Sequence, residues 1–426
     1  VYVANNLRLF VLTIISTFMK NLGIKLSLFI NYFVFAILLN SVGIVILKSQ
    51  NNYGVDEVQA SILEAFKDLP IAIVSFLVAS FLPRIGYKKA MLIGLGIVSA
   101  ACISMYYGNS FDSAKILFAA VGVSFALIKV SVYSMIGLVT SGEKEHNSFM
   151  SSIEGVFMIG IALAYFLFPA FNTEGEPDSW LNVYWLLAGL SILSFLFLLF
   201  TKFEKEAEIP GANILDDFKQ MFGLMTRLLI VIFVISAFLF VMIEQGIMTW
   251  LPSFNDKVLH LPENVSIMMA SILAIGLAVG RLLAGVITRK INWIWVLSIC
   301  TLFAMMLVIF VLPRTLDLNV GEINSLKDIP LIGFAFPIVG LFIAPIYPLL
   351  NSVVLSALPK KLHSPMTGLI VVFSALGGTL GSRVIGWLFK NQGPENAFYY
   401  TLIPMGLLLI SYFILKKLTS NNDIKA

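Results

Sequence analysis

The sequence predicts an all-α membrane protein in which twelve transmembrane helices form two six-helix halves. Of its 426 residues, 59% are hydrophobic and only 12% are charged, and the mean hydropathy is +0.93. An ordinary soluble protein carries about 25% charged residues, roughly twice as many. Repeated apolar runs of about 18 residues or more are typical of helices that cross a bilayer.

Twelve apolar runs of this kind follow one another along the chain, and most links between them are short. Their expected limits are 26–47, 57–83, 88–108, 115–139, 147–170, 180–201, 227–253, 264–288, 291–312, 330–358, 364–389 and 396–415. The long exception is the charged segment 202–226, which contains Pro210 and Gly211 and is interpreted as a linker between the halves. The expected order is a lead segment at 1–25, interpreted as an interfacial helix, the N-terminal half at 26–201, the linker, the C-terminal half at 227–417 and a tail at 418–426.

Basic residues are unevenly distributed between the two sets of loops. With the N-terminus inside, 18 of the 28 Lys and Arg residues fall on the inner side and 6 on the outer side. Cytoplasmic loops of membrane proteins carry such an excess. We therefore expect a multi-pass protein of the inner (plasma) membrane of the cell, with both termini in the cytoplasm.

Ionisable side chains inside the predicted spans are the candidate functional residues. Glu64, Lys67 and Asp68 lie three and four residues apart on the second predicted helix, so they share one helical face. Each charged side chain at mid-bilayer costs at least about 2.5–3.5 kcal/mol on insertion scales. Such a face requires protein or water around it, which predicts a bundle with a polar interior. The other intramembrane charges are Lys129, Glu154, Glu244, Arg281 and Arg383.

Apart from Lys88 and Lys89 at the very start of the third, the third, sixth, ninth and twelfth spans contain no charged residue. The simplest explanation is that these four helices face lipid and brace the others, which line a central cavity. The first and tenth spans have polar but uncharged residues, among them Asn40, Tyr347 and Asn351, and Gln245 follows Glu244 in the seventh.

Three stretches resemble a known family. They are 59–90, which ends in the basic turn containing Arg84; Ile-Gly-Leu-Ala-Val-Gly-Arg at 275–281; and Phe-Ile-Ala-Pro-Ile-Tyr-Pro at 342–348. Their order resembles the major facilitator superfamily of secondary transporters, and within it the fucose-permease-like branch of sugar–proton symporters. The resemblance implies the major facilitator fold and alternating access, in which two halves rock about a midplane site.

The chain departs from that branch at its proton-carrying residues. The acid of the first helix has no counterpart in the stretch around Asn40, and the acid of the fourth helix is absent around Lys129. The resemblance therefore transfers the fold, but it transfers neither the sugar substrate nor the proton site.

Each candidate residue has a functional and a structural interpretation. Lys129 binds an anionic group of the substrate, or it neutralises Asp68 or Glu64 across a helix contact. Asp68 and Glu64 carry the coupling proton, or they form a static ion pair with Lys67. The expected substrate contacts are Lys129, Lys67, Asn40, Glu244, Gln245, Tyr347 and Asn351. Gate or structural roles are expected for Arg383, Arg281, Glu154 and Arg84, with Arg383 paired to Glu64 as a latch between the halves.

These expectations describe a secondary active transporter of a small polar solute, anionic or sugar-like, coupled to protons. The alternative is a drug or lipid exporter of the same superfamily. An intramembrane enzyme would need a nucleophile–base pair or metal ligands at depth, whereas His146, His260 and His363 all fall in predicted loops. We expect no enzyme activity, cofactor or metal, and as partners the solute, protons and the bilayer, with no nucleic acid and a monomeric state.

Overall fold

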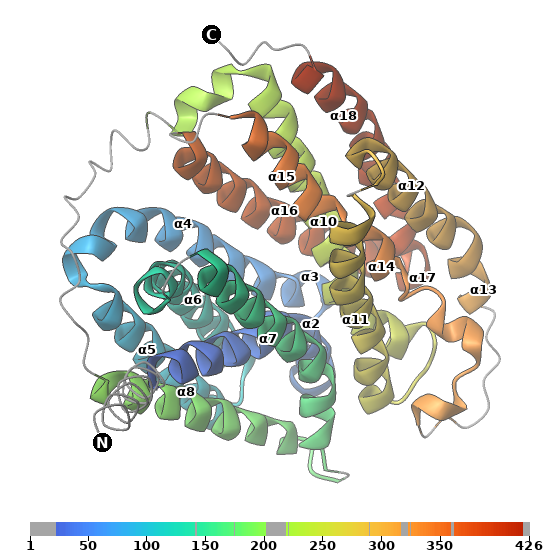
Figure 1. Ribbon diagram of the computed structural model, residues 1–426. Helices are drawn as coiled ribbons and strands as arrows, with labels where there is room; N and C mark the ends of the chain where they lie inside the picture. Colours follow the sequence, from blue (N-terminus) through green and yellow to red (C-terminus); the bar gives the residue numbers. More distant parts are fainter. Residues whose placement is uncertain are drawn as a thin grey trace, which may run out of the picture.

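The computed structural model describes residues 23–140, 143–173, 175–201, 219, 221–288, 290–316, 323, 325–358 and 362–420. The expected lead segment, most of the linker and the end of the tail lie outside these residues. The described chain is almost entirely helical, and the helices form two groups, one from each half of the sequence (Figure 1). Among the described residues, eleven helices are long and apolar enough to cross a membrane. The charged helix α4 (Ile62–Ile85) is the further span that completes the predicted fold of twelve helices in two halves.

The N-terminal half begins with the span Gly23–Asn40. It continues with α2 (Val42–Tyr53), α3 (Glu57–Ala60), α4, α5 (Tyr87–Gly108), α6 (Phe111–Val139), α7 (Glu143–Ala170) and α8 (Val183–Phe200). The first predicted span, 26–47, is therefore longer than expected and is interrupted at Ser41. The interruption has a local cause, because the Asn40 and Ser41 side chains donate hydrogen bonds to the carbonyls of Ala36 and Leu38, at 2.8 and 2.9 Å.

The C-terminal half repeats this plan after the linker. Its helices are α10 (Leu228–Lys257), α11 (Glu263–Ile287), α12 (Trp293–Met306), α13 (Leu312–Leu316), α14 (Val339–Ile343), α15 (Ile346–Ala357), α16 (His363–Gln392), α17 (Pro394–Ala397) and α18 (Leu402–Ser420). The predicted span 330–358 is divided into α14 and α15, with Pro345 between them. Proline cannot donate the backbone hydrogen bond that a continuous helix requires.

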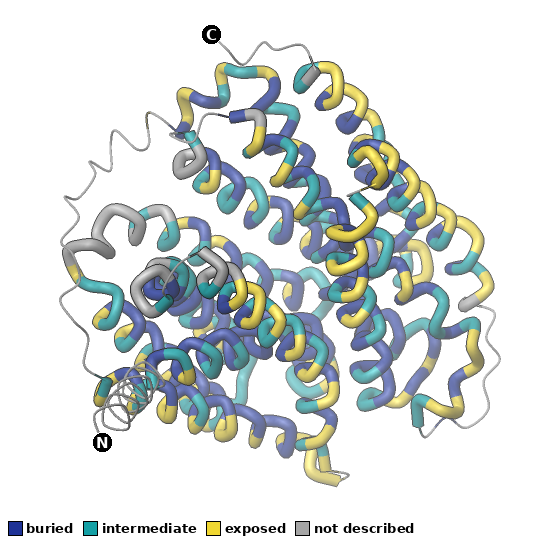
Figure 2. Tube along the Cα trace, in the orientation of Figure 1, coloured by how far each residue is buried: buried dark blue, intermediate teal, exposed yellow. Residues whose placement is uncertain are grey.

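Three of the four helices that carry no charge at depth, α8, α12 and α18, lie at the periphery of the bundle. Exposed apolar residues follow one another along the outer faces of α8, α12 and α18 (Figure 2), for example Ile192, Leu302 and Leu407. These helices pack inward against other members of their own half, α8 on α5 and α18 on α10 and α12. At these positions an apolar surface is matched to the hydrocarbon of a bilayer.

The two halves meet through α2 with α10, α4 with α16, and α7 with α11. We call the membrane face where residues 201 and 221 lie the linker end, and the opposite face the far end. In the far half of the seam the backbones approach closely, because a Cβ atom at Gly43 would overlap the carbonyl group of Thr249. A Cβ atom at Gly386 would likewise meet the Glu57 carbonyl oxygen at 2.9 Å. The halves are thus in direct contact there.

Candidate functional site

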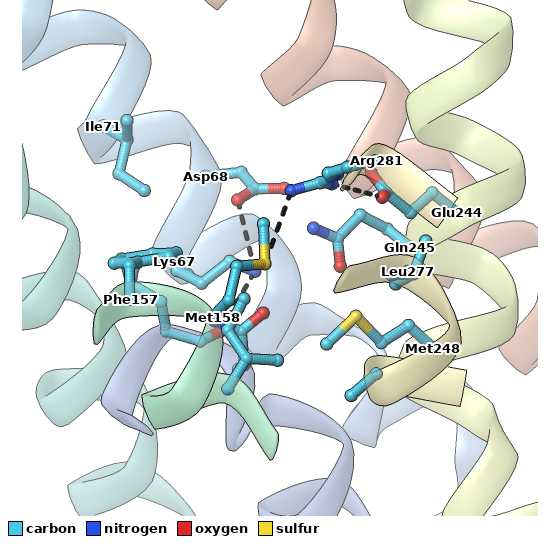
Figure 3. Close-up of a pocket in the computed structure, with 14 residues that line it drawn as sticks. Lys67, Asp68, Ile71, Phe157, Met158, Glu244, Gln245, Met248, Leu277 and Arg281 are labelled. Carbon is cyan, nitrogen blue, oxygen red and sulfur yellow. Dashed lines mark hydrogen bonds and ion pairs between the residues drawn. The ribbon is translucent and has the colours of Figure 1, made fainter. Parts of the chain in front are cut away.

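A cavity of about 210 Å³ lies between the halves near the middle of the bundle (Figure 3). Its polar lining comes from both halves: Asn40, Lys67, Asp68, Glu244, Gln245 and Arg281. Apolar side chains such as Phe157 and Met248 complete the wall. The structure thus brings six of the sequence-predicted residues to one site, and both halves supply charges to it.

Lys67 is the centre of the charged cluster on α4. Its Nζ atom donates a hydrogen bond to Glu64 and lies 3.5 Å from Asp68 Oδ1. All three side chains are buried, and Glu64 is fully so. Glu64 also accepts a hydrogen bond of 3.1 Å from the Thr249 hydroxyl on α10, in the other half. One lysine therefore serves two carboxylates, and the carboxylate that is held less closely, Asp68, is the one that faces the cavity.

A second ion pair stands on the opposite wall. Arg281 on α11 donates from Nη2 to Glu244 Oε1 on α10 at 2.9 Å. Its Nη1 atom lies 4.0 Å from the Met158 sulfur on α7, so the side chain reaches toward the N-terminal half. Figure 3 shows Asp68 and Arg281 extending toward one another from α4 and α11. The resemblance suggested a gate role for Arg281, and in the structure this residue lies on the cavity wall.

Helix α16 lies behind Asp68. A Cβ atom at Gly378 would collide with the Asp68 carboxylate and would touch Gln245 Cγ at 3.4 Å. Because Gly378 has no side chain, the Asp68 carboxylate can occupy this space. The Gly377-Gly378 pair in the sequence thus has a packing reason, since a Cβ atom at Gly377 would overlap the Phe238 backbone on α10.

Lys129 does not lie on the cavity wall and does not contact the α4 carboxylates. Its Nζ atom lies 5.7 Å from the centre of the Phe125 ring, and the charge of Glu154 acts on it through space, without a direct ion pair between the two in the described structure. Glu154 in turn accepts a hydrogen bond of 2.8 Å from the Tyr133 hydroxyl. The expected neutralisation of Asp68 or Glu64 by Lys129 is therefore replaced by a separate Lys129–Glu154 cluster within the N-terminal half.

The polar residues of the tenth predicted helix also lie off the cavity wall. The Tyr347 hydroxyl is 3.1 Å from Ser374 Oγ, and its ring stacks on Phe240 at 5.6 Å. Asn351 Oδ1 is buried without a partner in the described part of the chain. Neither residue is among those that line the cavity.

Arg383 connects the halves, although through other atoms than expected. Its Nη1 atom donates to the Val58 carbonyl at 2.6 Å and to Ser61 Oγ at 3.3 Å. The contact lies at the start of the expected second helix, one turn before Glu64, which has Lys67 and Thr249 as partners. Arg84, the remaining expected gate residue, has its side chain outside the described structure.

The main polar contact at the far end involves a residue that sequence reasoning overlooked. Lys48 on α2 is 2% exposed and forms an ion pair with Glu263 in the first turn of α11, across the two halves. It also donates to Asn172 Oδ1 at 3.0 Å and lies 5.8 Å from the centre of the Trp180 ring. A hydrogen bond of 2.6 Å from Asn51 occupies the second oxygen of Glu263.

Two further ion pairs join the halves at this end. Lys257 at the end of α10 contacts Glu57 at 2.5 Å, and Lys390 in α16 contacts Asp56 at 2.8 Å. The hydrogen bond from Lys390 lowers the pKa of Asp56 below its usual value. The Lys390–Asp56 contact therefore contributes its full stabilisation at pH values above the ordinary pKa of Asp. This stabilisation is lost as the pH falls through the lowered pKa of Asp56. We call the contacts of Lys48, Glu263, Glu57, Lys257, Asp56 and Lys390 the far-end seal.

A metal or redox centre finds no support in the described chain. No group of three or more His, Cys, Asp or Glu side chains with metal-binding geometry occurs among the described residues. Cys102 is buried and Cys300 half-buried, and both are free thiols. The polar lining of the cavity offers hydrogen bonding, charge pairing and proton binding.

The fold and the cavity define a multi-pass helical membrane protein with a polar site between two similar halves. The sequence profile described as the Major Facilitator Superfamily matches residues 26–382, most of the chain. The chain belongs to this superfamily, which confirms the family resemblance and the predicted fold.

A sugar transporter is among the related sequences. The glucose/mannose transporter GlcP of Bacillus subtilis (strain 168) is 26% identical over 192 residues, which take in 45% of this chain and 44% of GlcP. Less than half of that relative's length is therefore matched.

Solved structures share the fold at low sequence identity. A bacterial homologue of the human lysosomal transporter Spinster, inward-facing and unoccupied, has a TM-score of 0.74 at 13% identity and covers 95% of this chain and 98% of its own. The nucleoside transporter NupG has a TM-score of 0.70 at 16% identity, covering 92% and 99%. The E. coli fucose:proton symporter FucP has a TM-score of 0.61 at 12% identity, covering 92% and 98%.

Proposed function

We propose that the protein is a secondary active transporter that moves a small, neutral, sugar-like solute across the plasma membrane together with a proton. The observation that carries this proposal is the charged cavity between two halves that are sealed at one end. A site lined from both halves can be exposed on either side in turn as the halves rock. In this proposal both termini are cytoplasmic, so the far end faces outward and the described state is closed to the outside.

The far-end seal supports alternating access because its partners come from opposite halves. Lys48, Lys257 and Lys390 each contact a carboxylate of the other half. Ion pairs of this kind can be separated by a rigid-body movement of one half, with no change in the fold of either. All three pairs must break before the far end can open, so they stabilise the closed state relative to the open state.

The charges in the cavity favour a proton as the coupling ion. Glu64, Asp68 and Glu244 supply three negative charges, and Lys67 and Arg281 supply two positive ones. One bound proton brings this set to neutrality, and desolvated sites strongly favour neutral sets. Asp68 is the best proton carrier because it faces the cavity and shares its lysine with Glu64.

The balance of three carboxylates and two cations also favours a neutral solute over an anionic one. An anion would add a further negative charge to a set that already carries one in excess, so its binding would need a second proton. A neutral hydroxylated solute needs only one. Lys67 and Arg281 can donate to its oxygens, while Asp68, Glu244 and Gln245 can accept from its hydroxyl groups. The similarity to GlcP agrees with this class. The mostly charged polar lining argues against the alternative of a drug or lipid exporter.

Uptake into proteoliposomes tests the proposal. Purified protein is reconstituted, and radiolabelled neutral hexoses, hexuronates and nucleosides are offered with and without an inwardly directed proton gradient. We expect accumulation of a neutral hexose above its external concentration only when the gradient is imposed. Accumulation that is independent of the gradient, or that is restricted to the hexuronates, would contradict the proposal.

The Lys129–Glu154 cluster leads to a separate prediction. Lys129→Met should reduce transport, because it removes the positive charge that acts on Glu154 through space in the membrane interior. Glu154→Gln in the same protein should restore much of the lost rate, since the double variant carries no unpaired charge there. The measurement is the initial uptake rate and the apparent KM of the single and double variants. A rise in KM that the second substitution does not reverse would instead make Lys129 a substrate ligand, as the sequence allowed.

A further inference from the structure

The seam between the halves contains a second hollow, which is separate from the charged cavity. It has a volume of about 320 Å³ and lies between α4, α16 and residues 221–222 before α10. All eight side chains that line it are apolar, and Met221 packs against α16 with its sulfur about 3.0 Å from the position of a Cβ at Gly368. We call this hollow the α4–α16 groove. It lies toward the linker end, where no part of the far-end seal reaches.

The groove faces away from the transport cavity. On α4 the cavity is lined by Lys67, Asp68 and Ile71 and the groove by Leu69, Ala72, Ile73 and Leu77. At about 100° of turn per residue, the mean directions of these two sets differ by roughly 170°. The cavity side faces the centre of the bundle, so the groove side faces outward.

The facing helix gives the same direction. On α16, Gly378 approaches Asp68, whereas Val372 and Leu376 line the groove. At about 100° per residue these two residues point roughly 120° and 160° away from the direction of Gly378. Ile73 is 59% exposed and Leu376 is 38% exposed, at a depth where the surroundings of the protein are hydrocarbon. Within the part of the chain that the structure describes, the groove is thus open to the bilayer.

We propose that the α4–α16 groove binds one acyl chain of a bilayer phospholipid, which acts as a wedge between the halves at the linker end. A lipid chain is the occupant that fits, because the lining offers no hydrogen-bonding partner and the bilayer supplies chains at this depth without a path through the protein. The polar solute of the central cavity does not fit this groove, because the apolar lining cannot form hydrogen bonds with it. A chain between α4 and α16 must leave before these helices can close at the linker end. This site does not depend on the proposed substrate or on proton coupling.

Photochemical labelling tests the site in the full-length protein. The protein is reconstituted with phosphatidylcholine that carries a diazirine in its acyl chain, irradiated, and digested for mass spectrometry. We expect adducts on residues 69–77, 221–222 and 372–376 to exceed, several-fold, those on the exposed face of α8 around Ile192 and Leu196. The α8 face, whose two named side chains are 42% and 41% exposed, reports ordinary contact with surrounding lipid.

Variants that fill the groove make the test specific. Leu376→Trp and Ala72→Trp place an indole in the groove and should lower the adducts on the opposite wall several-fold. Ile192→Trp on α8 is the matched control and should leave them unchanged. The use of two groove variants covers the case in which one of them misfolds, which is judged by gel filtration and thermal stability. Equal labelling of the groove and α8, or labelling that neither groove variant reduces, would mean surrounding lipid only and would overturn the proposal.

Discussion

Asp68→Asn is expected to abolish accumulation of solute against a gradient while leaving exchange of solute across the membrane intact. The amide resembles the protonated acid in shape but cannot release a proton, so the cavity stays at its neutral charge throughout the cycle. A carrier of this kind equilibrates solute and cannot use a proton gradient. The measurement compares counterflow with gradient-driven uptake in proteoliposomes that contain the wild type or the variant.

Asp112→Asn is the control for this experiment. The chemical change is identical, but the Asp112 side chain is 83% exposed at the start of α6 and pairs with Lys115 within the same half. It should behave as wild type in both assays. If Asp68→Asn still accumulated solute under a proton gradient, Asp68 would not be the proton carrier. Glu64→Gln and then Glu244→Gln would be the next variants to measure.

Lys48→Met is expected to open the far end. The substitution leaves Glu263, whose side chain is 21% exposed, without its buried cation. Removal of one partner from a fully buried ion pair costs about 3–5 kcal/mol, and the cost at this partly exposed carboxylate is smaller. That cost applies to the closed state, because Glu263 can be hydrated once the halves separate. The population should therefore move toward states that are open at the far end.

Thiol labelling can report this opening. Ser253 is fully buried in α10 and lies 3.5 Å from Gln50 across the seam. In a background with Cys102 and Cys300 replaced by serine, Ser253→Cys should react several-fold faster with a membrane-impermeant maleimide when Lys48→Met is present. Lys115→Met removes a lysine from a pair within one half and should leave the rate unchanged.

A double-mutant cycle identifies the partner. Glu263→Gln alone should also raise the labelling rate, because Lys48 then lacks its carboxylate. If the two residues act as one contact, the double variant should gain little over either single variant. Additive increases in the logarithm of the rate would show that the two positions act independently, and the gate role of Lys48 would be lost.

The fold could be predicted from the sequence because the bilayer imposes it. Hydrocarbon requires long apolar helices, and their number and order follow from the apolar runs. The face shared by Glu64, Lys67 and Asp68 also follows from local geometry, since helical spacing alone brings these residues together. Properties that depend on one helix are therefore readable from the chain.

The contacts between helices were harder to predict. The sequence gives the depth of Arg383 and Glu64, but it does not give the rotation of α16 against α4. In the structure Arg383 contacts the Val58 carbonyl and Ser61, which lies one turn before Glu64. Lys48 follows an apolar run and looks like a loop charge in the sequence, whereas in the fold it lies against Asn172, Trp180 and Glu263. Lys129, Tyr347 and Asn351 are polar residues in apolar helices. The sequence alone does not show whether such a side chain packs among the helices of its own half or lines the cavity between the halves.

Because the cavity carries an excess negative charge, the proposed transport cycle should depend on the membrane potential. With its proton and a neutral solute bound, the site is electrically neutral and crosses the field without electrical work. The empty site, with three carboxylates and two cations, carries one net negative charge. A full elementary charge that crosses the whole membrane is worth about 2.3 kcal/mol per 100 mV. A potential that is negative inside therefore favours the outward-open state of the empty transporter, and this effect opposes the Lys48–Glu263 ion pair that keeps the far end closed. In an energised cell the resting transporter should be open to the outside, whereas in a detergent micelle, where there is no potential, it should be closed at the far end.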